Sequence, residues 1–160
     1  MRAIGIGLAL MAAAAFGQQA GAMKTYTSAD EIKALIAKAK SERKNNEPTV
    51  IQPILRLAPY NTNLEYRASV GPAAVHEKEA EMFYVIDGSG TLTTGGKLVE
   101  EKRTNADNLT GAAIEGGTER SVSKGDFIIV PENTPHWYNK INGVLVLMSI
   151  HVPRPVPAGH

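Results

Sequence analysis

The pattern of apolar and polar positions changes twice along this chain, and each change predicts a different kind of element. An uncharged apolar run occupies residues 3–16. Apolar residues at helical spacing follow it, and after about residue 50 short apolar segments alternate with connections rich in Gly and Pro. A period near 3.6 indicates a helix, whereas short apolar segments between turn residues indicate strands. The pattern therefore predicts a leader, one helix and a β-rich body.

The first 22 residues resemble a secretory signal peptide. Arg2 supplies a positive start, the apolar run follows it, and Ala20-Gly21-Ala22 has the small residues of a cleavage site. A membrane anchor is the alternative, but the run is shorter than the roughly 20 apolar residues that cross a bilayer. We expect a periplasmic or secreted protein that begins at about Met23 and does not insert stably in a membrane.

The next segment carries the pattern of a capped amphipathic helix. Ser28 and Glu31 have the spacing of a capping box. Apolar residues then recur on one helical face, at Ile32, Leu35, Ile36 and Ala39. This predicts a helix over residues 28–42 that packs outside the main sheet or at a dimer interface.

The rest of the chain predicts many short strands. They are expected at 50–57, 64–70, 81–86, 90–94, 97–102, 112–115, 119–122, 127–130 and 144–152. Pro53 indicates an edge strand or a bulge. Gly95-Gly96 predicts a tight hairpin between 90–94 and 97–102, and 103–109 is polar and loop-like. A single helix followed by such strands favours an all-β sandwich or barrel.

Composition and charge narrow the functional classes. The chain has 160 residues, 43% of them hydrophobic and 21% charged, as in a single globular domain. Without the leader, which holds one basic residue and no acidic one, Lys and Arg balance Asp and Glu at 16 each. The sequence has no pronounced block of basic residues, so we do not expect a nucleic-acid partner. The absence of Cys excludes disulfides and thiolate chemistry.

Two segments carry candidate chemistry. In the first, four residues separate His76 from Glu81 and six separate Glu81 from Gly88. In the second, Gly125 is followed after five residues by Pro131 and then by His136. These spacings resemble the two motifs of the cupin superfamily over about residues 71–152. The resemblance implies a double-stranded β-helix, or jelly-roll, barrel with an N-terminal α-helix, and it implies a homodimer.

The leader and helix patterns together with this resemblance predict a division of the chain, and the resemblance implies a metal site. The expected parts are a signal peptide at 1–22, a helical extension at 23–48, a cupin barrel at 49–153 and a tail at 154–160. The motif residues His76, Glu81 and His136 would be metal ligands. Three positions depart from the family pattern. Ala74 stands where the first motif has another His, Asn133 replaces a Gly of the second, and Asn139 comes one residue early.

Residue chemistry supports the same site. Imidazole and carboxylate groups suit one divalent transition metal, which we take to be Fe, Mn, Zn, Ni or Cu. In a strand, Glu81 shares a face with Phe83 and Val85 and so points toward the core. A buried carboxylate is costly without a cation or hydrogen-bond partner. The alternative partner of Glu81 is a buried arginine such as Arg67.

Other residues receive weaker assignments. Phe83 and Tyr138 are in phase with Glu81 and His136, so we expect them to form walls of a substrate pocket. His151 lies in an apolar strand, where a structural histidine is the more common role than a metal ligand.

Two functions remain open. One is a metal-dependent enzyme with oxidative, isomerase or lyase chemistry on a small molecule or carbohydrate. The other is a non-catalytic barrel that binds a small ligand or a metal.

Overall fold

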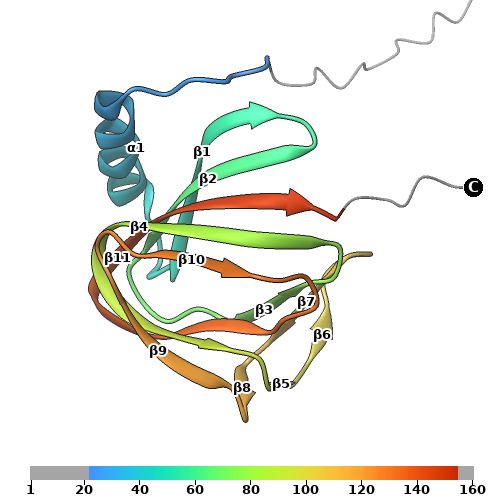
Figure 1. Cartoon of the computed structure of the whole chain (residues 1–160). Helices are drawn as coiled ribbons and strands as arrows, with labels where there is room; N and C mark the ends of the chain where they lie inside the picture. The colour runs from blue at the N-terminus through green and yellow to red at the C-terminus, as the bar shows by residue number, and fades with distance from the viewer. Residues whose placement is uncertain (1–21, 155–160) are drawn as a thin grey trace, which may run out of the picture.

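The computed structural model describes residues 22–154 (Figure 1). Helix α1 spans Ala29–Glu42, and the strands that follow are β1 (Thr49–Leu57), β2 (Tyr60–Arg67), β3 (Ala73–His76), β4 (Glu79–Thr94), β5 (Lys97–Val99), β6 (Lys102–Arg103), β7 (Asn108–Gly111), β8 (Ala113–Glu115), β9 (Thr118–Ser123), β10 (Phe127–Val130) and β11 (His136–Pro153). The predicted all-β architecture with one preceding helix is confirmed for these residues.

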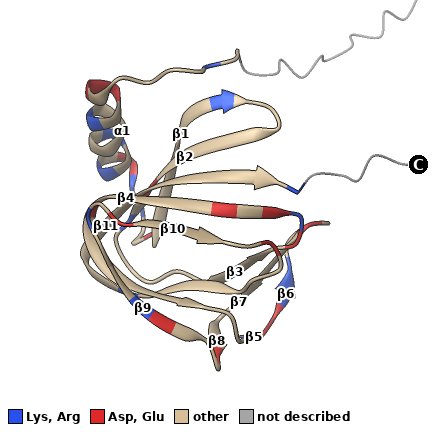
Figure 2. Ribbon diagram, viewed as in Figure 1, with Lys and Arg blue, Asp and Glu red and all other residues tan. Residues whose placement is uncertain are grey.

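Helix α1 begins and packs as its sequence predicts. The Ser28 side chain accepts a hydrogen bond from the Glu31 backbone at 3.2 Å, and the Glu31 carboxylate accepts one from the Ser28 backbone at 2.8 Å. The apolar face of the helix packs against Ile54, Leu64, Tyr66 and Val146. Residues of both charges cover the rest of α1 (Figure 2). The helix therefore lies on the outside of the sheet, which is one of its two predicted positions.

One large sheet winds around the barrel core. Along it the strand order is β1-β2-β11-β3-β7-β6, and β4 pairs with β11 on one side and with β9 and β10 on the other. Strand β1 lies at the edge, and its register shifts between Pro53 and Leu55, as Pro53 predicts. A small second sheet joins β5 to β8.

Strand β4 bends at Gly88, and this bend lets one strand serve both halves of the barrel. Gly88 has a φ of +83°, and a Cβ there would lie 1.9 Å from the Val144 carbonyl oxygen. Only glycine accommodates this conformation and this approach together. The glycine that ends the first motif is therefore required by the backbone.

The predicted hairpin at Gly95-Gly96 is wrong. Strand β4 continues to Thr94 and pairs with β9 and β11, whereas β5 pairs with β8 in the other sheet. Both glycines have positive φ, of 77° and 71°, so the chain does turn there. The turn redirects the chain to another sheet, because a two-residue connection specifies a reversal and not the partner strand. The predicted loop at 103–109 also contains parts of β6 and β7.

The barrel interior holds the main core. It consists of Phe83, Val85, Leu92, Val122, Ile128, Val130, Tyr138, Leu145 and Leu147. On β4, Glu81, Phe83 and Val85 are buried while Tyr84 between them is exposed, which confirms the predicted inner face. Across residues 22–154, no helix has the length and apolar character needed to cross a membrane. Nearly all of the predicted signal peptide, at 1–21, and the tail from 155 onward lie outside the described residues.

Candidate metal centre

Three histidines surround one buried carboxylate on the inner face of the barrel. Glu81 on β4 is 4% exposed, and acidic segments mark the start of this strand in Figure 2. Its Oε2 atom lies 3.2 Å from Nε2 of His76 and 3.1 Å from Nε2 of His136. Its Oε1 atom lies 3.3 Å from Nε2 of His151. The structure therefore brings together the three predicted residues and adds His151.

The curvature of β11 makes this cluster. The strand has 18 residues and would span roughly 60 Å if it were straight. Register shifts between Tyr138 and Lys140 and between Ile141 and Leu145 bend it instead. One end places His136 opposite Ala74 of β3, and the other end places His151 opposite Glu81 of β4. The same strand thus supplies two of the three imidazoles.

Each imidazole is held by its other ring nitrogen. Nδ1 of His76 lies 2.8 Å from Oδ1 of Asn108, and Nδ1 of His151 lies 2.7 Å from Oε1 of Glu79. Nδ1 of His136 lies 3.2 Å from the Thr134 carbonyl oxygen. Carbonyl and carboxylate oxygens only accept hydrogen bonds, so these contacts assign the proton to Nδ1 in the neutral rings. In a neutral ring, Nε2 then carries a lone pair that faces Glu81, whereas a protonated ring donates from Nε2 to the carboxylate.

Burial and the histidines act in opposite directions on Glu81. Burial alone would raise its pKa, since it disfavours the charged carboxylate. Hydrogen bonds from His136 and His76 outweigh burial and hold the pKa of Glu81 well below the usual range. Burial would likewise lower the pKa of His76, but its contact with Glu81 raises it. The carboxylate is therefore ionised, and the surrounding imidazoles stabilise its charge.

The alternative partner for Glu81 is used elsewhere. Arg67 pairs with Glu65, with 2.6 Å between Nη2 and Oε2. Its guanidinium also lies over the Tyr138 ring, 4.8 Å from the centroid. The alternative in which Arg67 neutralises Glu81 through an ion pair is therefore wrong.

Phe83 and Tyr138 lie beside the histidines within the core. The Phe83 ring is 6.1 Å from the His136 ring and 5.5 Å from the Tyr138 ring, between centroids. Both side chains are almost fully buried. Within the described residues, the Tyr138 hydroxyl is buried without a hydrogen-bond partner. Their role as walls of a substrate pocket stays a prediction.

A departure from the family motif has a backbone explanation. Asn133, which stands in place of glycine, has a φ of 58°. Asn tolerates this left-handed region better than most residues. Its backbone N–H donates to the His76 carbonyl oxygen at 2.8 Å, so the turn supports β3. The replacement therefore preserves the turn that precedes His136.

Sequence reasoning missed the position of His151. It assigned this residue a structural role, whereas the structure places its ring 4.9 Å from the His76 ring and against Glu81. Donor atoms of His76, Glu81 and His151 all lie within 4.8 Å of one another. The sequence offered no signal for this, because nothing in an apolar strand tells which residue it faces across the sheet.

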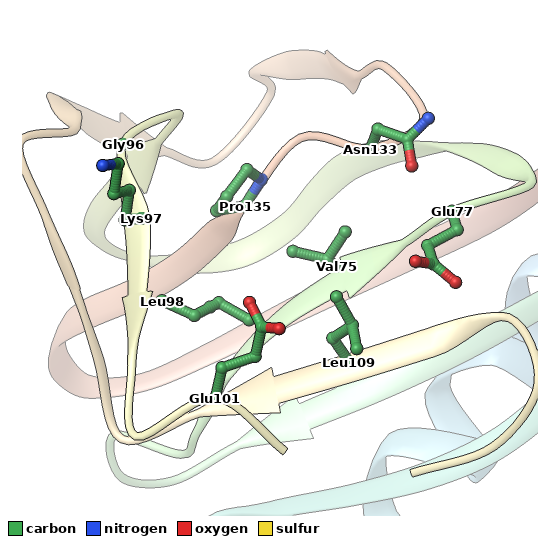
Figure 3. Close-up of a pocket in the computed structure, with 9 residues that line it drawn as sticks. All are labelled: Val75, Glu77, Gly96, Lys97, Leu98, Glu101, Leu109, Asn133 and Pro135. Atoms are coloured by element: carbon green, nitrogen blue, oxygen red, sulfur yellow. The ribbon is translucent and has the colours of Figure 1, made fainter. Parts of the chain in front are cut away.

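A cavity of about 340 Å³ lies beside β3, and none of the histidines lines it; Figure 3 shows the residues that do. Val75 and Leu109, which pair across β3 and β7, form part of its wall, and Leu98 of β5 also borders it. The carboxylates of Glu77 and Glu101 lie at its margin. Val75 and His76 are consecutive residues of β3 and point to opposite faces, so this cavity does not open on the histidines around Glu81.

Comparisons with known proteins identify the fold. A family model described as Cupin matches residues 43–154. TT1209 from Thermus thermophilus is 18% identical with a TM-score of 0.50, covering 72% of this chain and 93% of its own. KdgF from Halomonas sp. is 15% identical with a TM-score of 0.51, covering 71% and 87%.

A third similar structure contains a metal ion. Hydroquinone 1,2-dioxygenase PnpCD, in complex with Cd²⁺ and 4-hydroxybenzonitrile, is 14% identical with a TM-score of 0.53, covering 69% of this chain and 68% of its own. Comparison with curated protein sequences gives no match. At these identities the similar structures establish the fold alone, which is the predicted jelly roll.

Proposed function

The chain belongs to the cupin family, and we propose that it binds one divalent transition-metal ion through Glu81 and the three histidines around it. The observation that carries this proposal is the convergence of three Nε2 atoms on one buried carboxylate. Without a metal ion, either the three lone pairs would face a negative charge or the rings must be protonated to donate to it, and a bound divalent ion removes this conflict.

The distances from Glu81 to the histidines are near the spacing of metal ligands, and the donor atoms of His76, Glu81 and His151 are also mutually close. Nitrogen and oxygen ligands lie about 2.1 Å from a transition metal, so adjacent donors are about 3 Å apart. The three distances from Glu81 to the imidazoles are 3.1, 3.2 and 3.3 Å. Three imidazoles and one carboxylate suit Fe, Mn, Zn, Ni or Cu better than Mg or Ca. Glu81 and the three histidines therefore fit a divalent transition-metal ion.

The surrounding residues would prepare this site for binding. Asn108, Glu79 and the Thr134 carbonyl fix the rings so that each presents Nε2 inward. Ala74, next to His136, contributes only a methyl group where the family motif has another imidazole. The side toward Ala74 would remain available to a small molecule.

A metal held there would polarise a bound oxygen atom or activate water or dioxygen. We propose a metal-dependent enzyme with oxidative, isomerase or lyase chemistry on a small molecule or carbohydrate. The open side at Ala74 favours this reading. A non-catalytic barrel that holds a metal or small ligand is the second candidate, because one imidazole of the family motif is missing.

Metal analysis of protein purified without chelator tests the site. We expect about one metal per chain in the wild type and in the control Glu115→Gln, which changes an exposed carboxylate of β8. Glu81→Gln and His136→Ala should lose most of it while retaining the wild-type circular dichroism spectrum. Stoichiometric metal in folded Glu81→Gln protein, or none in the wild type, would refute the proposal.

A transplanted ligand tests the place of His151. We expect His151→Ala to weaken metal binding by about tenfold or more. Adding Ala74→His to this variant should recover part of the affinity, because residue 74 shares the inner face of β3 with His76 and lies opposite His136. Unchanged affinity in folded His151→Ala protein would show that His151 is not a ligand.

We also propose that the protein is exported to the periplasm or medium, on the support of the leader pattern in residues 1–22. The intact mass of the recovered protein should correspond to a chain that starts at about Met23. A mass that includes Met1 would contradict cleavage.

A further inference from the structure

A second, smaller opening lies beside β4, between β9 and β10. It has a volume of about 160 Å³ and is lined by Leu92, Thr94, Arg120, Ile128 and Ile129. Strands β9 and β10 follow one another along β4 and part near the turn at 124–126. The opening therefore borders the barrel core where the two halves of β4 diverge.

The strand register places Arg120 on the inner face of the barrel. Arg120 of β9 pairs with Leu92 of β4, and residues directly opposite in antiparallel strands point to the same side. Leu92 is 2% exposed and belongs to the barrel core. The Arg120 side chain therefore leaves the backbone on the core side, and the residue is exposed to solvent.

The same register connects this opening to the histidines. Thr94 pairs with Thr118 of β9 on one side and with His136 of β11 on the other. Two residues along the strands, on the same face, Arg120, Leu92 and Tyr138 form another row. Arg120 therefore lies on the same face as His136, two residues along and two strands away, which is roughly 12 Å between the backbones.

Arg120 is the charged residue in this lining, and its charge is not met by the protein. Throughout residues 22–154 no ion pair or side-chain hydrogen bond involves it. The neighbouring carboxylate, Glu119, lies on the opposite face of β9 and accepts from Asn139. Arg67, the other arginine near the core, is by contrast fully engaged with Glu65.

We propose that this opening recognises the carboxylate of a small organic acid, with Arg120 as the binding residue. The guanidinium presents two parallel N–H donors that match a carboxylate. Leu92 and Ile128 offer apolar contact for the adjoining carbon atoms. The inference rests on the proposed metal site only in placing the reactive end of the molecule near His136. It narrows the substrate class to organic acids.

Calorimetric titration with benzoate and with its neutral analogue benzamide tests this subsite, on metal-free and metal-loaded protein. We expect benzoate to bind, and we expect benzamide to bind at least about tenfold more weakly. Arg120→Gln should weaken benzoate binding by about tenfold, and Arg120→Lys should weaken it less, because it keeps the charge but loses the fork. The control Lys140→Gln removes a charge from an exposed position of β11 and should change the affinity less than about twofold.

The outcomes separate this inference from the proposed function. Arg120→Gln should keep the metal content of the wild type, since Arg120 touches no proposed ligand. Arg120-dependent benzoate binding in a protein that holds no metal would sustain the subsite and refute the metal site. No binding of benzoate at roughly 10 mM, or equal losses in Arg120→Gln and Lys140→Gln, would overturn the inference.

Discussion

Glu81 is 4% exposed, and its ionised carboxylate meets three imidazoles and no guanidinium or ammonium group among the described residues. Such a group is stable only where its charge is compensated. Protonated imidazoles can compensate it, and a divalent ion does so more completely, because it also accepts the three lone pairs. The outer contacts of the rings, at Asn108, Glu79 and Thr134, hold Nδ1 in either case and turn each Nε2 toward Glu81.

At this scale, Glu79 is predicted to be a positioning residue. Its Oε1 accepts from Nδ1 of His151 at 2.7 Å, and it lies 3.9 Å from Nδ1 of His76. Replacing such a partner typically weakens metal binding by about 10- to 100-fold. We expect Glu79→Gln to weaken metal binding at the low end of this range, because the amide oxygen still accepts a hydrogen bond, and Glu79→Ala to weaken it further.

A competition titration with a chromophoric chelator measures this. The control is Glu77→Gln, because Glu77 pairs with Arg103 outside the cluster. Equal affinities for Glu79→Ala and wild type would show that His151 needs no support from Glu79.

At the scale of elements, the bends of β4 and β11 build the site and α1 covers the sheet outside it. Both strands are long, and each contributes to both halves of the barrel. Helix α1 touches none of the histidines. It buries Ala39 against β1, β2 and β11 through the second core cluster. Loss of the helix cap should therefore reduce stability without changing the site.

We expect Ser28→Ala to destabilise the protein by about 1 kcal/mol and to lower Tm by roughly 2–4 °C. Metal content should not change. The control is Ser41→Ala within the same helix, where the Ser41 hydroxyl bonds only to the Lys38 carbonyl; it should have little effect. Thermal unfolding followed by circular dichroism gives both values. A loss in Ser41→Ala as large as that in Ser28→Ala would contradict the capping argument.

The cap also predicts a pH dependence. The Ser28 backbone N–H, followed by Lys24, lowers the pKa of Glu31. A carboxylate whose pKa is lower in the folded state adds stability that is fully present above its unfolded pKa. This contribution to stability is lost as the pH falls through the lowered pKa. Glu31→Gln should therefore remove this part of the pH dependence of stability.

At the scale of the whole molecule, an apolar area remains on the outside of the barrel. Phe127 and Ile129 of β10 are 60% and 62% exposed, and Tyr84 of β4 is 37% exposed. The Tyr84 and Phe127 rings lie 6.0 Å apart. Contiguous exposed apolar side chains of this kind favour a protein contact. This area is the best candidate for the homodimer contact that the sequence predicts.

We expect light scattering at micromolar concentration to give twice the mass of one chain. Ile129→Lys should shift the protein toward the monomer, because a dimer would bury the new charge. Ile51→Lys changes an equally exposed residue, 59% exposed, on β1 and serves as the control. A monomeric wild type, or equal effects of the two variants, would contradict this contact.

The sequence by itself determined most of the helix and strand positions and the direction of Glu81 toward the core. The capping box of α1, the bulge at Pro53 and the two-residue alternation around Glu81 are local properties, and the structure confirms each of them. The spacing of His76, Glu81 and His136 also follows from local pattern, because each motif spans two consecutive strands and the short turn between them.

Only the tertiary structure decided what those elements face. The turn at Gly95-Gly96 sends β5 to β8 instead of back along β4, and the curve of β11 brings His151 to Glu81 across the sheet. Partner choice depends on contacts between residues far apart in the chain, and such contacts leave no periodic trace in the sequence.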